Sequence, residues 1–127
     1  MNYEKKSLDN GDRDLRERTK AFAIHVIRMF SSLPITTEAQ VLGKQVLRSG
    51  TSVGANYREA YRSRSKAEFI AKLGDCLKEL DESSYWFELL VETGIVASSS
   101  LDALQRECYE LQAIFTTIVK KCKSGVS

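Results

Sequence analysis

The sequence predicts an all-α protein folded as an antiparallel up-down-up-down four-helix bundle. Apolar residues recur at alternating steps of three and four along four long segments, and the connections between these segments are short. Such spacing places apolar side chains on one face of a helix, and short connections make consecutive helices antiparallel neighbours. One proline and 7 glycines in 127 residues leave little material for a turn-rich β fold. We expect one domain spanning residues 1–127.

The first helix is expected to follow a polar, aperiodic segment, residues 1–11, which predicts a mobile N-terminal arm. Asp12 or Asp14 can cap the start of this helix, and Pro34 lies just past its end. Its apolar stripe consists of Leu15, Thr19, Phe22, Val26, Met29 and Leu33.

The second helix is predicted to begin with a capping box formed by Thr37 and Gln40. Its stripe consists of Ala39, Leu42, Val46, Ser49, Val53, Asn56 and Ala60, and a neighbouring row consists of Leu47, Gly50, Gly54, Tyr57 and Tyr61. Because a glycine inside a helix costs about 1 kcal/mol relative to alanine, Gly50 and Gly54 indicate a kink or, as we prefer, a closely packed neighbour. Asn56 is expected to be a buried polar residue that fixes helix register or assembly.

The third and fourth helices carry similar signals. Ser65 and Glu68 predict a capping box for the third helix, and Gly94 suits the position just past its end. Serines 98–100 offer N-caps for the fourth helix, which residues 124–127 follow as a short tail. The stripes consist of Ile70, Leu73, Leu77, Leu80, Ser84, Phe87 and Val91, and of Leu101, Leu104, Cys108, Leu111, Phe115, Ile118 and Cys122.

Folding into this topology would separate the charges of a nearly neutral chain. The formal net charge is only +2, from 19 basic and 17 acidic residues. The pole shared by the start of the first helix, the end of the second, the start of the third and the end of the fourth would carry 14 basic and 8 acidic residues. The opposite pole would carry the remaining 5 basic and 9 acidic residues.

The basic pole has two interpretations, an anion-binding end or ordinary solvated helix ends. Phosphate backbones and acidic protein surfaces are the anions that such an end could bind. The residues predicted to make these contacts are Arg58, Arg62, Arg64 and Lys66. Tyr57 and Tyr61 lie near these arginines and could stack on unpaired bases, although tyrosines at such positions are more often core or interface residues.

The second and third helices carry more apolar residues than a monomeric bundle needs. The excess either widens the core or leaves an exposed patch, which usually marks an interface. Self-association is our preferred interpretation. The residues predicted to form an oligomer interface or a close helix contact are Gly50, Gly54, Tyr57, Tyr61 and Trp86.

The sequence carries no constellation for catalysis, a metal or a cofactor. His25 is the only histidine, so a paired Glu-x-x-His motif cannot occur, and no phosphate-loop lysine follows Gly54. Three cysteines without C-x-x-C spacing argue against a disulfide framework or a zinc site. No apolar run approaches the length of a membrane span. We therefore expect a non-enzymatic cytoplasmic protein that does not contact a membrane.

Three motifs resemble the bacterial "four helix bundle protein" family, also called the 23S ribosomal RNA intervening-sequence protein family. They are Leu-Arg-Ser-Gly-Thr-Ser-Val-Gly-Ala-Asn-Tyr-Arg-Glu-Ala at 47–60, Ser-Arg-Ser-Lys-Ala-Glu-Phe-Ile-Ala-Lys-Leu at 63–73 and Asp-Glu-Ser-Ser-Tyr-Trp-Phe-Glu-Leu-Leu at 81–90. The resemblance implies a small cytosolic bundle that assembles as a homopentamer, with no catalytic residues to carry over. Some relatives are encoded inside insertions of large-subunit ribosomal RNA genes.

A related group, the accessory proteins of diversity-generating retroelements, forms basic pentamers that bind nucleic acid and a reverse transcriptase. This chain, with a net charge of +2, is only weakly basic. The preferred prediction is a homopentameric interaction scaffold whose acidic and basic poles meet a protein partner. The alternative is an RNA- or DNA-binding accessory protein that uses the basic pole.

Overall fold

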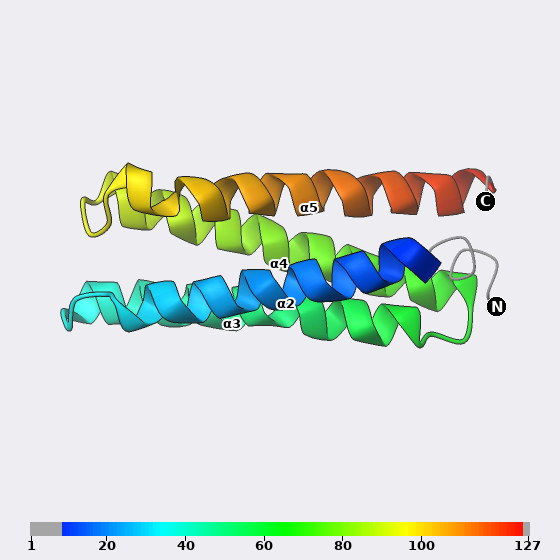
Figure 1. Ribbon diagram of the computed structural model, residues 1–127, viewed down its shortest axis with the longest axis horizontal. Helices are drawn as coiled ribbons and strands as arrows, with labels where there is room; N and C mark the ends of the chain where they lie inside the picture. The colour runs from blue at the N-terminus through cyan, green and yellow to red at the C-terminus, as the bar shows by residue number, and fades with distance from the viewer. Residues whose placement is uncertain (1–8, 126–127) are drawn as a thin grey trace.

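The protein is an antiparallel bundle of four long helices, which confirms the predicted fold class (Figure 1). The computed structural model describes residues 9–125. The helices are α2 (Asp9–Ser31), α3 (Thr37–Tyr61), α4 (Lys66–Glu92) and α5 (Ser98–Ser124). Over the described range no residue lies in a strand. The start of α2, the end of α3, the start of α4 and the end of α5 lie at one end of the bundle, as the up-down-up-down topology requires.

The start of α2 differs from its prediction. The helix begins at Asp9, so residues 9–11 belong to it, whereas the rest of the expected arm, 1–8, lies outside the described residues. Asp12 is not a cap. It lies inside the helix with 3% of its surface exposed and accepts a hydrogen bond from the Tyr57 hydroxyl. The role of this carboxylate therefore depends on Tyr57, which is distant in sequence and which a local capping rule does not consider.

The capping predictions succeed for α4 and fail for α3 and α5. The Ser65 hydroxyl accepts from the Glu68 N–H at 3.1 Å, as predicted, and Gly94 follows α4 with φ of +78°. In α3 the cap is Thr36, one residue earlier than predicted, and the Gln40 side chain donates to the Pro34 carbonyl. Of two adjacent threonines, the one with an extended backbone becomes the cap.

In α5 the N-cap residue is Ala97, which offers no side-chain acceptor, so the serine caps predicted at 98–100 are wrong. Ser98 is instead the first residue of the helix, and its hydroxyl donates to Asp102 at 3.4 Å. At the other end α5 runs to Ser124 and is followed by Gly125 with φ of +77°, so the predicted tail is shortened by one residue. Residues 126–127 lie outside the described range.

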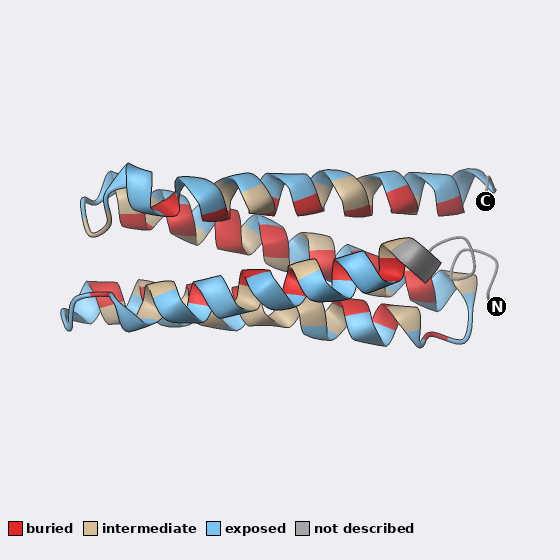
Figure 2. Ribbon diagram, in the orientation of Figure 1, coloured by how far each residue is buried: buried red, intermediate tan, exposed pale blue. Residues whose placement is uncertain are grey.

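The core lies along the facing sides of the four helices, as the buried bands in Figure 2 show. The predicted stripes supply most of it, but Asn56 does not belong to it. Asn56 is partly exposed, and the neighbouring residue Tyr57 is fully buried instead. Besides Tyr57 and Asp12, the core holds a buried polar pair of Ser49 and Ser83, whose hydroxyl oxygens lie 2.7 Å apart. Each hydroxyl is thereby satisfied inside the apolar interior.

Candidate functional site

A basic groove runs along the outer side of the bundle between α2 and α3. Its volume is about 550 Å³. The lining residues are Arg16, Thr19, Lys20, Ala23, Thr51, Gly54, Ala55, Arg58, Glu59 and Arg62. The groove therefore combines a floor of small side chains with rims of long, mostly cationic ones.

The small residues of the floor explain why the surface is hollow here. A Cβ atom at Gly54 would lie 3.1 Å from the Thr19 Oγ1 atom, which is closer than most real contacts. The backbone of α3 therefore lies against α2 at this point. One turn further along, a Cβ at Gly50 would lie 2.8 Å from a Val26 methyl group. The glycine row predicted from sequence thus forms a close helix contact within the chain.

Cations line both rims of the groove. Arg16 and Lys20 lie four residues apart on α2, and Arg58 and Arg62 lie four residues apart on α3, so each pair faces the same direction. Among the described residues no carboxylate forms an ion pair with Lys20, Arg58 or Arg62. Four cations and one acid therefore line the groove, which gives it an excess of positive charge.

The one acid in the lining is engaged elsewhere. The Glu59 carboxylate accepts a hydrogen bond of 2.7 Å from the Lys72 ammonium of α4. This hydrogen bond, together with the charge of Lys72, lowers the pKa of Glu59 and raises the pKa of Lys72. Both side chains are solvent-exposed, so the pair adds little stability. Its effect on the groove is to offset the charge of Glu59.

Arg16 is the only one of the four cations with a described acidic partner, and that partner is buried. The Arg16 Nε atom lies 2.9 Å from Asp12 Oδ2, while Asp12 Oδ1 accepts a hydrogen bond of 2.7 Å from the Tyr57 hydroxyl. The Tyr57 ring packs against Phe115 of α5 with centroids 5.7 Å apart. Burial and then the hydrogen bond to Asp12 raise the pKa of Tyr57. A chain of contacts thus connects the bundle core to a groove arginine.

Only half of the predicted anion contacts lie in this groove. Arg58 and Arg62 line it, whereas Arg64 is exposed in the connection to α4 and Lys66 is the partly buried first residue of that helix. Sequence reasoning named neither Arg16 nor Lys20 as a contact. Their four-residue spacing on α2, with the antiparallel pairing to α3, is the signal that could have identified them.

The residues predicted to form an oligomer interface or a close helix contact are mostly buried or partly buried within the single chain. Gly50 and Tyr57 are buried, Gly54 lies against α2, and Tyr61 is partly buried beside Arg58 and Arg62. Trp86 is partly buried, and its indole N–H is enclosed without an acceptor among the described residues. Whether any of these residues takes part in self-association stays a prediction.

Two other aromatic residues are more exposed than these. The Tyr85 ring packs against Trp86 with centroids 5.1 Å apart, and 53% of the surface of Tyr85 remains exposed. Tyr109 on α5 is 52% exposed. Both tyrosines lie on the two helices away from the basic groove.

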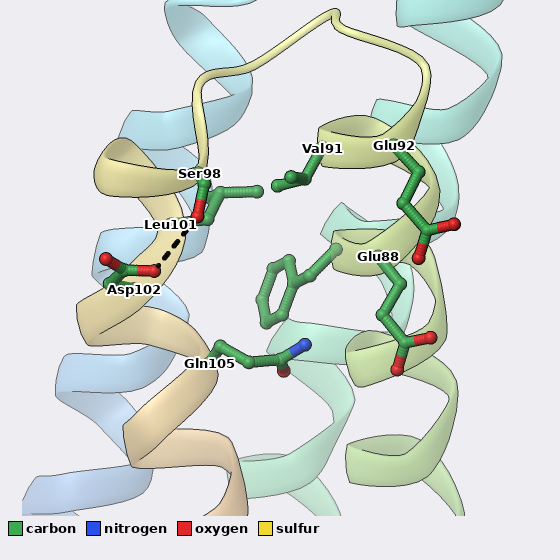
Figure 3. Close-up of a pocket in the computed structure, with 8 residues that line it drawn as sticks. Glu88, Val91, Glu92, Ser98, Leu101, Asp102 and Gln105 are labelled. Carbon is green, nitrogen blue, oxygen red and sulfur yellow. Dashed lines mark hydrogen bonds between the residues drawn. The ribbon is translucent and has the colours of Figure 1, made fainter.

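A second, smaller cavity of about 160 Å³ lies between α4 and α5 near the acidic pole. Its inner wall is apolar, with Leu101 and Val91 directed toward each other in Figure 3. Glu88 and Glu92 lie on the rim with their carboxylates directed away from the cavity. Within residues 9–125 no three His, Cys, Asp or Glu side chains lie close enough to hold a metal ion. The cavity therefore has the character of a packing defect with an acidic rim.

The cysteines are buried free thiols. The Cys108 thiol donates to the Leu80 carbonyl at 3.1 Å and the Cys76 thiol to the Val53 carbonyl at 3.6 Å. Burial raises the pKa of each of these two thiols to about 12. Since the thiolate is the reactive form, both are inert core residues.

The fold and the groove define a class: a small all-α bundle with a groove in which cations outnumber acids. A model of the 23S rRNA-intervening sequence protein family matches residues 12–117, and the chain belongs to that family. No helix within the described range is both long and apolar enough to span a bilayer. No curated protein matches the chain. The inferred relation to retroelement accessory proteins stays a prediction.

A solved structure similar to this chain is that of a protein of unknown function from the S23 ribosomal protein family of Bacteroides thetaiotaomicron. It shares 35% sequence identity with this chain and superposes with a TM-score of 0.78. The match covers 83% of this chain and 97% of that one. The fold described here is therefore shared over almost the full length of that relative.

Proposed function

We propose that this protein is a non-enzymatic accessory protein that binds nucleic acid by holding phosphates in the basic groove. The observation that carries the proposal is the convergence of Arg16, Lys20, Arg58 and Arg62 on one groove whose only acid is engaged by Lys72. Lysine and arginine side chains that neutralise phosphates supply most of the affinity in sequence-independent binding. The three buried free thiols fit a reducing compartment, and we place the protein in the cytoplasm.

The number of cations predicts how binding should depend on salt. Each neutralised phosphate contributes a slope of about −0.9 to log affinity against log salt for duplex DNA and about −0.7 for single strands. Four groove cations, one of them shared with Asp12, therefore predict a slope of about −2 to −4. Such a contact is weak for one chain and becomes stronger if several copies bind one strand.

Fluorescence anisotropy with labelled RNA and DNA at increasing salt tests the proposal. Lys20→Ala and Arg58→Ala should each weaken binding and reduce the slope by about one unit. Arg28→Ala is the matched control, because Arg28 is an exposed cation near the far end of α2. No binding at low salt, or equal slopes for the groove variants and the control, would contradict the proposal.

A second candidate function is a self-assembling interaction scaffold. The half-exposed aromatic residues Tyr85 and Tyr109 support it, because large apolar groups on a surface often belong to an interface. The family resemblance implies a homopentamer, whose acidic and basic poles would then be available to a protein partner. Analytical ultracentrifugation at micromolar concentration tests this candidate. A monomer would contradict it, and Tyr85→Ser should weaken any oligomer that forms through α4.

A further inference from the structure

We infer that one end of the basic groove binds the terminal phosphate of a nucleic-acid strand in preference to an internal phosphodiester. This end is the one at the basic pole, where α2 begins and α3 ends. This inference rests on the proposed function and names the chemical group that the site selects. The site is a hollow of about 270 Å³ lined by Arg16, Arg58, Tyr61 and Arg62, called here the arginine hollow. Its three arginines also line the basic groove, so the two are continuous.

Three guanidinium groups from two helices surround this hollow. Arg16 comes from α2, and Arg58 and Arg62 come from the last turns of α3 and its cap. Arginine presents its N–H groups as a planar fork that matches two phosphate oxygens at once. A terminal phosphate offers three oxygens, whereas a backbone diester offers two. Three arginines therefore suit the terminal group better.

Charge favours the same group. A phosphomonoester carries about −1.5 to −2 charges at pH 7, because its second pKa is about 6, whereas a diester carries only one. The described residues place no carboxylate in an ion pair with Arg58 or Arg62. The attraction to three guanidinium groups grows in proportion to the ligand's charge. A dianion is therefore selected over a monoanion.

Arg16 is held in position before a ligand arrives. Its Nε atom is paired with Asp12, which is 3% exposed and is held in turn by the hydroxyl of the fully buried Tyr57. Half of the Arg16 side chain remains exposed to a ligand while its Nε atom is paired with Asp12. A side chain fixed in this way loses less conformational freedom when it binds a ligand.

Helix stabilisation alone does not account for this cluster. A cation in the last turn of a helix, such as Arg58, interacts favourably with the helix dipole, worth about 0.3–1 kcal/mol. Arg16 has no such explanation, because it lies in the N-terminal half of α2, beyond the first turn where dipole effects act. The ion pair of Arg16 with Asp12, four residues earlier, contributes to the stability of α2. That pair does not require Arg58 and Arg62 to line the same hollow, and their joint location points to a ligand.

The experiment compares strands that differ only at the 5′ end. The probes are one 12-nucleotide RNA with a 5′-phosphate or a 5′-hydroxyl and a dye at the 3′ end, the matching pair in DNA, and adenosine monophosphate as a competitor. For the full chain we expect the 5′-phosphate to raise RNA affinity at least tenfold at pH 7.5. At pH 5, where the phosphate loses its second charge, the preference should fall to about threefold or less.

The variants separate the arginine hollow from the rest of the groove. Arg16→Gln should abolish the preference for the 5′-phosphate, and Arg16→Lys should reduce it, because a lysine keeps the charge without the fork. Lys20→Ala should weaken both RNAs equally and leave the preference intact. Arg28→Gln is the control for loss of an exposed α2 charge. If Arg16→Gln fails to fold by circular dichroism, the exposed Arg58→Gln provides the same test.

Each outcome has a distinct meaning. Equal affinity for the two RNAs would overturn the terminal-phosphate inference and leave the proposed function standing. A preference that survives both Arg16→Gln and Arg58→Gln would also overturn it. Competition by adenosine monophosphate as effective as by the phosphorylated strand would show a free-nucleotide site and refute selection of a strand end. Absence of binding to every strand would refute both the inference and the proposed function.

Discussion

The two sides of α2 are built differently. Toward α3, the contact is made by glycines: Gly50 lies against Val26 and Gly54 lies against Thr19, so the two helices touch with almost nothing between them. Toward α5, the helices are further apart, and a groove of about 440 Å³ separates them. There the link is an ion pair, in which Arg18 Nη2 donates to Glu107 Oε1 at 2.6 Å and Arg18 Nε donates to Glu107 Oε2 at 3.0 Å.

This difference shows which neighbour fixes α2. Closely packed buried atoms tolerate little change in side-chain volume or helix position. A partly exposed ion pair contributes at most about 1 kcal/mol to stability. The α3 side therefore sets the position of α2, and the α5 side tolerates adjustment. The basic groove belongs to the fixed side. The backbone positions that carry its cations are fixed relative to each other, because the small residues beneath them do not allow the helices to shift.

The largest effect should come from filling the α2–α3 contact. Gly50→Leu would place a Cβ within 2.8 Å of a Val26 methyl group and within 3.2 Å of Val26 Cβ, which cannot rotate away. We expect a loss of about 3 kcal/mol or more in the free energy of unfolding, because overpacking forces the backbones apart. Urea denaturation followed by circular dichroism measures it.

A matched control is available on α4. Gly74 is an exposed helical glycine around which a new Cβ would meet nothing within 4 Å. Gly74→Ala should therefore stabilise the protein by up to about 1 kcal/mol through helix propensity alone. If Gly50→Ala proved as stabilising as Gly74→Ala, the close contact between α2 and α3 would be refuted.

The second effect concerns the hydrogen bond that joins Tyr57 of α3 to Asp12 of α2. Tyr57→Phe should cost about 2 kcal/mol at neutral pH, because it removes a hydrogen bond to a buried charged group. The folded protein raises the pKa of Tyr57 above its ordinary value of 10.0, so this stabilisation is present below pH 10 and is lost as pH rises further. The difference in stability between the wild type and the variant should therefore narrow above pH 10.

Comparison with the variant isolates Tyr57 from the other groups that titrate in this range. Cys76 and Cys108, whose pKa values are also raised, lower the stability of both proteins alike above about pH 9. Denaturation midpoints measured at pH 8, 10 and 11 are sufficient. A difference that stayed constant through pH 11 would contradict the assignment of the buried Tyr57–Asp12 bond.

Much of the fold could be predicted from the sequence because it depends on periodicity. The stripes of all four helices are long, and the glycine row indicated a close neighbour of the second helix without saying which helix it is. The roles of single polar residues could not be predicted in the same way. Asp12 looked like a cap and is a core acceptor, and Asn56 looked buried while its neighbour Tyr57 is the core residue. Whether a helical residue faces the core or solvent can differ between neighbours such as Asn56 and Tyr57, because consecutive residues point in directions about 100° apart.

The sequence predicted the part of the candidate site that lies on α3, but not the part that lies on α2. Arg58 and Arg62 were identified from the cluster that ends α3, whereas Arg16 and Lys20 join them only across the α2–α3 contact. Which residues of α2 face those arginines depends on how far the two helices slide past each other. That offset is set by the contacts of Gly50 and Gly54, and their partners on α2 cannot be read from α3 alone.

The smallest effect is expected on the α5 side of α2. Arg18→Gln would remove the charged hydrogen bonds to Glu107 and the longer contact to Glu110. The bond to Glu107 raises the pKa of Arg18, so the arginine is charged throughout the accessible pH range. The arginine is 27% exposed and Glu107 30%, so solvent screens the pair and a loss of about 0.5–1 kcal/mol is expected. The loss should shrink in 1 M salt, unlike that of Gly50→Leu. A salt-independent loss above 2 kcal/mol would mean that α5 holds α2 as firmly as α3 does.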